Sequence, residues 1–220
     1  MKYLIFQALA IAGLLSFCYS CRNEVADIDG NVYHTVKIGK QVWMVENLKT
    51  TRYRNGDLIP IVADSLGWYS LSKGAYCNYE NNADSFSLVY GRLYNWFAIS
   101  DNRNIAPDGW HVATDADWKL LVTYLGGENV AGKKLKEVGM DHWQSLNTKA
   151  TNETGFSALP GGARFVGKNF NCIGLVGFWW SSSEANMENA WVWRIGNDDD
   201  LTYSRDDNKR TGYSVRCVLD

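Results

Sequence analysis

The chain has 220 residues, a formal net charge of −2 and an aromatic content of 14%. This charge balance offers no basic stripe for a nucleic-acid backbone, so we expect no nucleic-acid partner. The length fits one large domain. The aromatic residues can supply a sizeable core, because each buried ring removes roughly 150–250 Å² from water.

The first residues predict export and a lipid anchor. The apolar run 3–17 is shorter than the roughly 20 residues of a membrane-spanning helix and is typical of a secretory signal. Cys21 follows a serine in a pattern that resembles the lipobox of bacterial lipoproteins, although Cys18 replaces the usual leucine. We therefore expect a signal peptide over 1–20, acylation of Cys21 at the outer membrane or cell surface of a Gram-negative bacterium, and a tether over 21–26. Ordinary cleavage and secretion is the alternative.

Few cysteines remain for disulfide bonds in such a mature chain. With Cys18 removed and Cys21 acylated, the chain keeps Cys77, Cys172 and Cys217. One disulfide at most can form, and one thiol is left over. Disulfides persist in exported proteins, and we expect Cys172 to pair with Cys217 because both lie in the strand-rich C-terminal half.

The first folded segment is predicted to be a β-hairpin. Two runs within 29–48 are rich in β-branched and aromatic residues and are joined by Gly39-Lys40, a two-residue turn with glycine first. The segment 27–31 (Asp-Ile-Asp-Gly-Asn) is similar to the start of a calcium loop but lacks the downstream bidentate glutamate. We interpret it as a turn into the first strand. Residues 55–88 are rich in Gly, Asn, Asp and Ser and predict a long loop.

The clearest helix is predicted to begin at Thr114. Asp117 follows three residues later, in a pattern that resembles a capping box, and Gly126 is a natural stop. The apolar stripe of this helix consists of Trp118, Leu121, Val122 and Leu125.

Two more helices are predicted on either side. Residues 131–139 predict a short helix. Residues 90–100 predict another, because apolar side chains recur there at helical spacing. These side chains are Tyr90, Leu93, Tyr94, Phe97 and Ala98.

The sequence beyond about residue 155 predicts an antiparallel meander. Short segments rich in aromatic and β-branched residues alternate with polar turns. The strand segments are 178–183, 190–195, 201–205 and 212–218. Helices followed by an antiparallel sheet indicate an α+β domain, and we assign it to 27–220.

Four of the ten tryptophans lie within 178–193. Trp191 and Trp193 share strand parity, whereas Trp179 and Trp180 point to opposite faces of their strand. Inward-facing rings of a half-buried strand belong to the core, where Trp118 is a natural partner. We interpret most of this cluster as structural.

Some aromatic side chains are nevertheless predicted to form an exposed binding platform. A ring presents a flat apolar face that can stack on a sugar, and exposed aromatic patches commonly mark binding sites. The candidates are Trp68, Tyr69, Tyr79, Trp191 and Trp193.

Six blocks of sequence, in order, resemble the motifs of the Fibrobacter succinogenes major paralogous domain, a family found in many bacterial surface lipoproteins. The one small departure is Ala113, where the family usually has proline. The resemblance implies a C-type-lectin-like fold, similar also to sulfatase-modifying factors, with two helices packed on a twisted, loop-rich antiparallel sheet. It implies no reaction. The blocks are DIDGNVYHTVKIGKQVWMVENLKTTRYRNG, YGRLYNWFAI, GWHVATDADWKLLVTYLGG, ATNETGFSALPGG, WWSSSE and GYSVRCV.

Calcium is the one metal that the sequence suggests. Ca²⁺ takes about six to eight oxygen ligands, which two acidic stretches of the C-terminal half could supply, although the sugar-binding signatures of C-type lectins are missing. Charged hairpin tips that keep a meander soluble are the alternative interpretation. The candidate ligands are Asp198, Asp199, Asp200, Asp206 and Asp207.

No catalytic motif stands out in the sequence. His34, His111 and His142 lie in no recognisable catalytic setting, and His111 is interpreted as closing the loop before a helix. Related sulfatase modifiers use a close cysteine pair to bind copper, whereas Cys172 and Cys217 are distant in sequence. We expect a non-enzymatic, membrane-anchored surface lipoprotein that binds a glycan or a protein. The alternatives are an oxidase-like enzyme and a structural subunit of a surface appendage.

Overall fold

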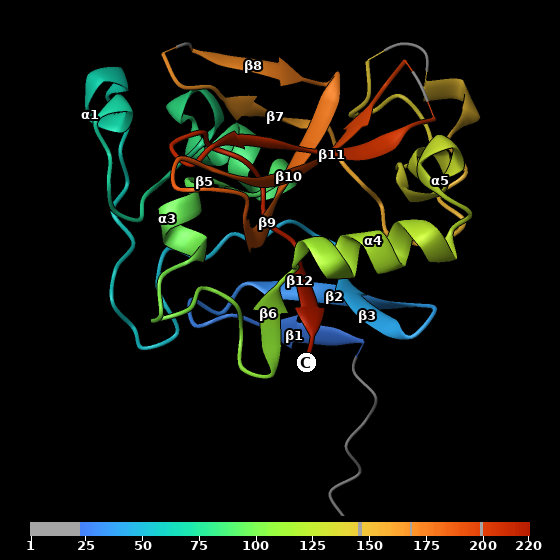
Figure 1. Cartoon of the computed structure of the whole chain (residues 1–220), viewed down its shortest axis with the longest axis horizontal. Helices are drawn as coiled ribbons and strands as arrows, with labels where there is room; N and C mark the ends of the chain where they lie inside the picture. Colours follow the sequence, from blue (N-terminus) through green and yellow to red (C-terminus); the bar gives the residue numbers. More distant parts are fainter. Residues whose placement is uncertain (1–22, 145–146, 168, 199) are drawn as a thin grey trace, which may run out of the picture.

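A five-stranded antiparallel sheet joins the two ends of the described chain (Figure 1). The computed structural model describes residues 23–144, 147–167, 169–198 and 200–220. The strand order is β1-β2-β3-β12-β6, so the last strand of the chain lies between β3 and β6. The strands are β1 (Glu24–Ala26), β2 (Val32–Ile38), β3 (Gln41–Met44), β6 (Trp110–Val112) and β12 (Cys217–Leu219).

A second layer stands above this sheet in Figure 1. It contains the three-stranded antiparallel sheet β11-β10-β9 and the two-stranded ladders β4-β5 and β7-β8. The strands are β4 (Tyr76–Cys77), β5 (Leu93–Tyr94), β7 (Gly161–Arg164), β8 (Phe170–Ile173), β9 (Val176–Glu184), β10 (Asn189–Gly196) and β11 (Thr202–Asn208).

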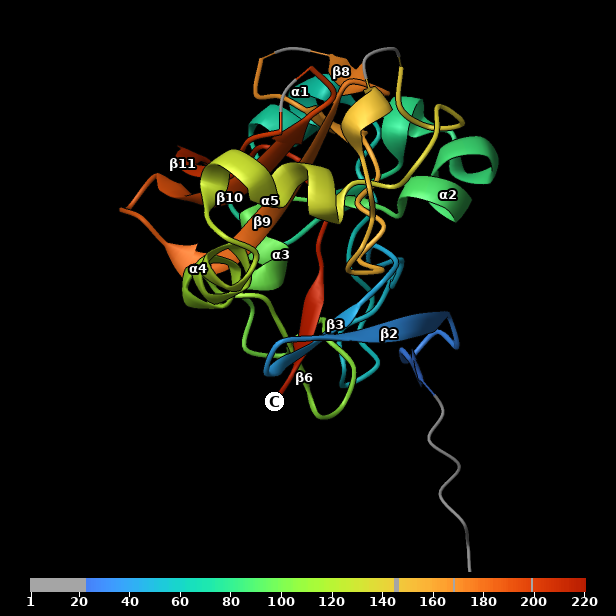
Figure 2. The same cartoon turned by 90° about the vertical axis from the view of Figure 1, so that its right-hand side faces the viewer.

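The helices complete an α+β architecture. The two longest described helices are α4 and α5, with ten and eight residues, and Figure 2 shows them as neighbours. Among the helices of the described ranges, none combines the length and the apolar character needed to cross a bilayer. The helical segments are α1 (Ser65–Tyr69), η1 (Tyr79–Asn81), η2 (Ala83–Ser87), α2 (Leu88–Tyr90), α3 (Trp96–Ile99), α4 (Asp115–Tyr124), α5 (Glu128–Leu135) and η3 (Asn147–Lys149).

The N-terminal hairpin forms as predicted. Ile38 pairs with Gln41 across a turn in which Gly39 has a φ of 61°, a value that glycine adopts without strain. The interpretation of 27–31 as a turn is also confirmed. There the Asp27 carboxylate accepts hydrogen bonds from the amide of Asn31 at 2.9 Å and from that of Asp29 at 3.0 Å, which folds the chain from β1 into β2.

The predicted meander is confirmed for three strands and wrong for the fourth. β9, β10 and β11 pair in sequence order, with Trp193 of β10 opposite Trp179 of β9. The segment 212–218 instead leaves this sheet, and Val218 pairs with Trp43 of β3 and His111 of β6. Without it, β3 and β6 would present unpaired edges inside the domain.

The three-stranded sheet is covered on both faces, which explains the two adjacent tryptophans. Trp179 and Trp180 point to opposite faces, yet both are fully buried and belong to different core clusters. Trp118 of α4 stacks on Trp193 with the ring centroids 5.9 Å apart and contacts Trp43 of the lower sheet at 4.9 Å. The predicted structural role of the cluster is therefore confirmed, with α4 packed between the two sheets.

The capping box of α4 is confirmed. The Thr114 hydroxyl accepts from the Asp117 amide at 3.1 Å, and the Asp117 carboxylate accepts from the Thr114 amide at 2.9 Å. All four residues of the predicted apolar stripe are buried. Gly126 follows the helix with a positive φ, as expected for a stop. The next helix, α5, begins and ends earlier than the predicted 131–139.

The helix predicted over 90–100 is wrong. The segment enters the two-residue strand β5 and then the single turn α3. Asn95, between them, accepts hydrogen bonds from the amides of Ala98 at 3.1 Å and Ala75 at 3.0 Å, and donates to the Lys73 carbonyl at 2.8 Å. These bonds hold the segment against the preceding loop, which overrides its helical periodicity.

A buried arginine ties distant parts of the chain together. The Arg216 guanidinium, fully buried, donates to the carbonyls of Phe156 at 2.6 Å and Met44 at 3.3 Å, and to Asn47 Oδ1 at 3.1 Å. Burial lowers its pKa to about 9. Asn47 Oδ1 also accepts from Trp179 Nε1 at 2.8 Å. Four segments that are remote in sequence thus meet at one polar centre.

Candidate functional site

The five aromatic side chains predicted as a platform do not share one surface. Trp68, Tyr79 and Trp193 are buried, and Trp191 is partly buried on β10. Tyr69 alone is broadly exposed, at 57% of its surface. The prediction of a single platform is therefore wrong.

The shared face of Trp191 and Trp193 explains why they do not form a platform. Trp193 lies under α4, where its Nε1 donates to the Asp115 carboxylate at 3.1 Å. Trp191, two residues earlier, lies beside the same helix with Lys119 5.8 Å from its ring centre. Strand parity correctly places the two rings on one face, but the sequence does not reveal that α4 covers this face.

Trp68 and Tyr69 stay together and line a cavity of about 430 Å³ between α1 and the end of β7. A smaller hollow of about 350 Å³ also includes Tyr69. We call the two together the α1 groove. The larger cavity is lined by Ser65, Leu66, Trp68, Tyr69, Arg164, Phe165, Gly167 and Asn169. The smaller one is lined by Tyr69, Ser70, Val166, Asn208 and Arg210.

Trp68 fixes α1 to the body of the protein. Its Nε1 donates to the Arg210 carbonyl at 2.7 Å. Its ring packs so closely on Gly212 that a Cβ there would lie 3.0 Å from it. With Trp68 turned inward, Leu66 and Tyr69, three residues apart on the helix, are left on its outer side. Leu66 is 81% exposed, so the groove has an apolar and an aromatic lip.

The floor of the groove is a buried arginine stacked on aromatic rings. The Arg164 guanidinium carbon lies 4.6 Å from the ring centre of Trp68 and 5.1 Å from that of Phe170. Its two terminal nitrogens donate to the carbonyls of Val62 at 2.6 Å and Ala63 at 2.8 Å. These contacts hold β7 against the segment that leads into α1, and they form a rigid floor.

Tyr79 supports this floor and does not line the groove. It belongs to the same buried cluster as Trp68 and contacts the rings of Phe170 at 5.2 Å and Phe86 at 5.3 Å. Of the five predicted platform residues, only Trp68 and Tyr69 thus lie at one cavity.

The predicted calcium ligands do not come together. Asp198 and Asp200 lie at the turn before β11, whereas Asp206 and Asp207 lie near the end of that strand. Four residues of extended chain separate Thr202 from Asp206, about 13 Å. Asp199 lies outside the described residues. Within the described ranges, no three His, Cys, Asp or Glu residues form a group that could hold a metal ion.

The separated carboxylates have their own partners. Asp206 accepts from the Asn189 amide group at 2.8 Å, and Asp207 accepts from the Tyr213 hydroxyl at 2.6 Å. Asp200 lies 3.9 Å from the ammonium group of Lys149. These contacts fit the alternative interpretation, in which the acidic residues are structural and solvating.

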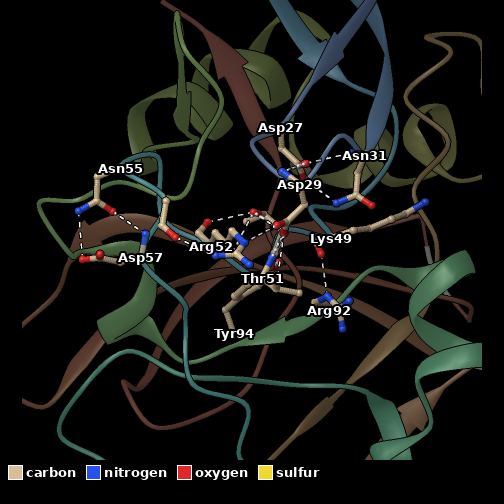
Figure 3. Close-up of polar contacts among 12 residues, drawn as sticks. Asp27, Asp29, Asn31, Lys49, Thr51, Arg52, Asn55, Asp57, Arg92 and Tyr94 are labelled. Atoms are coloured by element: carbon tan, nitrogen blue, oxygen red, sulfur yellow. Dashed lines mark hydrogen bonds and ion pairs between the residues drawn. The ribbon is translucent and has the colours of Figure 1, made fainter.

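The carboxylates of the turn 27–31 are also engaged, as Figure 3 shows. Asp29 accepts from the hydroxyl of Thr51 at 2.9 Å and from its amide, and it pairs with Arg52 at 3.2 Å. Burial alone would raise the pKa of Asp29, but the hydrogen bonds from Thr51 and Thr50 and the charge of Arg52 hold it below its ordinary value. The turn therefore anchors the segment after β3.

The expected disulfide between Cys172 and Cys217 does not form, since Cys77, Cys172 and Cys217 are all free thiols. Cys217 is buried in β12, between β3 and β6 of the five-stranded sheet, whereas Cys172 is half-buried on β8. Burial raises the pKa of all three thiols, that of Cys77 to about 12. A protonated thiol is a poor nucleophile and a poor metal ligand. Cys21 lies outside the described residues.

Each histidine faces a carboxylate. His111 Nδ1 lies 2.7 Å from the carboxylate of Asp220, and its Nε2 lies 3.1 Å from that of Asp117 at the start of α4. This arrangement agrees with its predicted role in closing the loop before the helix. His34 lies 2.7 Å from Glu46, and His142 lies 2.8 Å from Glu137.

Comparison with known proteins points to one family. The sequence model of the Fibrobacter succinogenes major domain matches residues 36–219, which confirms the resemblance carried by the six blocks. No curated protein and no solved structure matches the chain.

Proposed function

The chain belongs to the Fibrobacter succinogenes major domain family, and from this premise we propose that it is a non-enzymatic surface lipoprotein that binds carbohydrate in the α1 groove. One observation carries the proposal: the exposed ring of Tyr69 borders a cavity whose floor is fixed by Trp68 and Arg164. An exposed ring on a rigid floor can stack on a ligand with little loss of conformational entropy.

The lining of the groove suits a sugar. The ring of Tyr69 and the side chain of Leu66 offer apolar area for the C–H face of a pyranose. Polar groups that can both donate and accept hydrogen bonds surround this area, as an apolar pocket with a few placed polar groups requires. They belong to Ser65, Ser70, Asn169 and Asn208.

The position of the groove supports a surface role. The described chain begins at residue 23, two positions after Cys21. Figures 1 and 2 place β1 at one end of the domain and α1 with β8 at the opposite end. If a lipid on Cys21 holds the chain on the outer membrane, the groove is directed away from the membrane and towards ligands outside the cell.

Two further features support the proposal. The packing of α4 and α5 against antiparallel sheets is compatible with a C-type-lectin-like fold, which we propose for the domain. Cys172 and Cys217 lie on strands of different sheets, and their thiols have raised pKa values. This arrangement does not favour the copper-binding pair of an oxidase.

A glycan array tests the proposal, with the acylated protein embedded in lipid nanodiscs. We expect binding that Tyr69→Ala abolishes and that a matched variant, Tyr124→Ala on α4, leaves unchanged. Tyr124 is a suitable control because it is similarly exposed, at 65%. Equal effects of the two variants would place the site elsewhere. Binding to a surface protein with no glycan bound would reject a carbohydrate ligand, and recovery as a polymer would favour the appendage subunit.

The lipid anchor has a separate test. Mass spectrometry of the N-terminal peptide from the membrane fraction should show Cys21 as the acylated first residue. An unmodified N-terminus in the soluble fraction would contradict the predicted anchor. It would not bear on the proposed binding in the groove.

A further inference from the structure

We infer that the α1 groove selects anionic carbohydrate, and that a carboxylate or sulfate group of the sugar is held by the positive charges of Arg164 and Arg210. This inference rests on the proposed function and specifies its ligand class. It adds a preference for charged sugars, because the aromatic lip by itself would accept neutral sugars equally well.

Arg164 carries a buried charge whose described partners are all neutral. Only 2% of its surface is exposed. It donates to two carbonyls and lies over two aromatic rings, and the neighbouring thiol of Cys77 stays protonated because burial raises its pKa to about 12. Within the described ranges, Arg164 forms no ion pair. A buried charge without a counter-ion is unfavourable, and a ligand anion in the cavity that it lines would relieve this.

Arg210 adds a second positive charge at the mouth of the groove. Its backbone is fixed at both ends, since its amide donates to Asn208 Oδ1 at 3.0 Å and its carbonyl accepts from Trp68. Its side chain lines the smaller hollow beside Tyr69 and forms no ion pair in the part of the chain that the structure describes. Arg210 is half-buried and lines the same hollow as Tyr69.

No acidic side chain in the described part of the chain pairs with these two arginines. Among the described residues that line either hollow of the α1 groove, none is Asp or Glu. Asp64, which precedes α1, is engaged in capping that helix through the amide of Gly67. Arginine matches the planar geometry of carboxylate and the oxygens of sulfate through paired N–H donors.

A second cavity of the protein differs from the α1 groove, because the arginine that lines it is paired with carboxylates. Arg103 also lines a cavity, of about 520 Å³, but it pairs with Asp101 at 2.7 Å and with Asp57 at 3.1 Å. Its charge is satisfied internally, and Asp101 lines the same cavity, so Arg103 provides no uncompensated positive charge there. Arg103→Gln is therefore the matched control for substitutions in the α1 groove.

The test compares paired oligosaccharides by calorimetry with the acylated protein in nanodiscs. Each pair consists of an anionic sugar and its neutral form, namely oligogalacturonate with its methyl ester and a sulfated oligosaccharide with its desulfated form. We expect the anionic form to bind at least tenfold more tightly. Arg210→Gln should remove this preference and retain the weaker binding of the neutral form, whereas Arg103→Gln should change neither.

The outcomes separate the inference from the proposed function. Equal affinity for the anionic and neutral forms, with both lost in Tyr69→Ala, would overturn the inference and leave carbohydrate binding intact. An array on which no glycan binds would overturn both. Inorganic sulfate binding as tightly as the sulfated sugar would show an anion site without sugar recognition and would also reject the inference.

Discussion

Arg216 and Arg164 are two buried arginines with contrasting surroundings. Both guanidinium groups lie over aromatic rings, Arg216 at 4.1 Å from Phe156 and Arg164 at 4.6 Å from Trp68. Both donate to backbone carbonyls, and neither forms an ion pair within the described chain. Arg216 is enclosed on every side by protein, whereas Arg164 lines a cavity.

This difference separates a structural role from the recognition role that we propose for Arg164. Arg216 has three acceptors from two remote segments around it, so its charge and hydrogen bonds are used to hold the fold. Arg164 has two carbonyl partners, is almost fully buried and lines the α1 groove. Substitutions at the two positions should therefore produce different patterns of stability and binding.

The largest effect is expected for Arg216→Met. Each buried acceptor that loses its donor destabilises the fold by about 1–3 kcal/mol, so we expect a loss of at least about 3 kcal/mol in the free energy of unfolding, measured by urea denaturation. The matched change Arg210→Met, at a half-buried position without an ion pair, should cost less than about 0.5 kcal/mol. A loss under about 1 kcal/mol for Arg216→Met would contradict the structural role.

Arg164→Gln should have an intermediate effect on stability and a clear effect on binding. Glutamine can replace part of the donation to Val62 and Ala63, so we expect the free energy of unfolding to fall by about 1–3 kcal/mol. The folded variant should lose its preference for anionic over neutral sugars in a calorimetric comparison. A retained preference would show that Arg164 serves the fold alone.

Tyr69→Ala should affect binding and leave stability unchanged. The side chain is exposed and contributes little to the core, so the melting temperature should stay within the error of the measurement. Affinity for the sugar should fall at least tenfold, which corresponds to about 1.4 kcal/mol. An unchanged affinity would show that the aromatic lip is not part of the binding site.

A smaller effect is expected from pH. Burial by itself would lower the pKa of His111, but its hydrogen bonds to Asp220 and Asp117 outweigh this and raise it. A raised folded-state pKa stabilises the protein below the ordinary histidine pKa of about 6.5, and the contribution is lost as the pH rises through the raised value. His111→Gln should therefore flatten the decline of the melting temperature above pH 6.5. An unaltered decline would contradict the role of this contact.

No effect is expected from a chelator. The described carboxylates of the two acidic stretches lie apart, and the α1 groove contains none. Sugar binding measured by calorimetry should therefore be the same with and without EDTA. A loss of binding that added Ca²⁺ restores would place the site at a metal that this account does not include.

The sequence predicts the parts of the fold that local contacts determine. The capping box of Thr114 and Asp117 and the turn at Gly39 depend on residues within one turn or hairpin, and both are confirmed. The segment around Asn95 does not follow its helical spacing, because its hydrogen bonds run to Ala75 and Lys73, about 20 residues earlier in the chain. β12 leaves the meander for a similar reason, because it pairs with β3 and β6, which lie far from it in the sequence.

The sequence predicts only the aromatic part of the α1 groove. An adjacent Trp68 and Tyr69 in a polar segment indicate a binding surface, and both line the cavity. Arg164 and Arg210 come from segments about 100 residues or more further along the chain, and nothing in their local sequence marks them. Their role depends on the absence of acidic neighbours in space, which only the tertiary structure shows.

The central claim is that recognition takes place in the α1 groove while the tryptophan cluster serves the core. An NMR titration of the isotopically labelled protein with an acidic oligosaccharide tests it most directly. We expect shift changes confined to residues 65–70, 164–167 and 208–210. Changes centred on Trp191 and α4, or on the turn before β11, would contradict it.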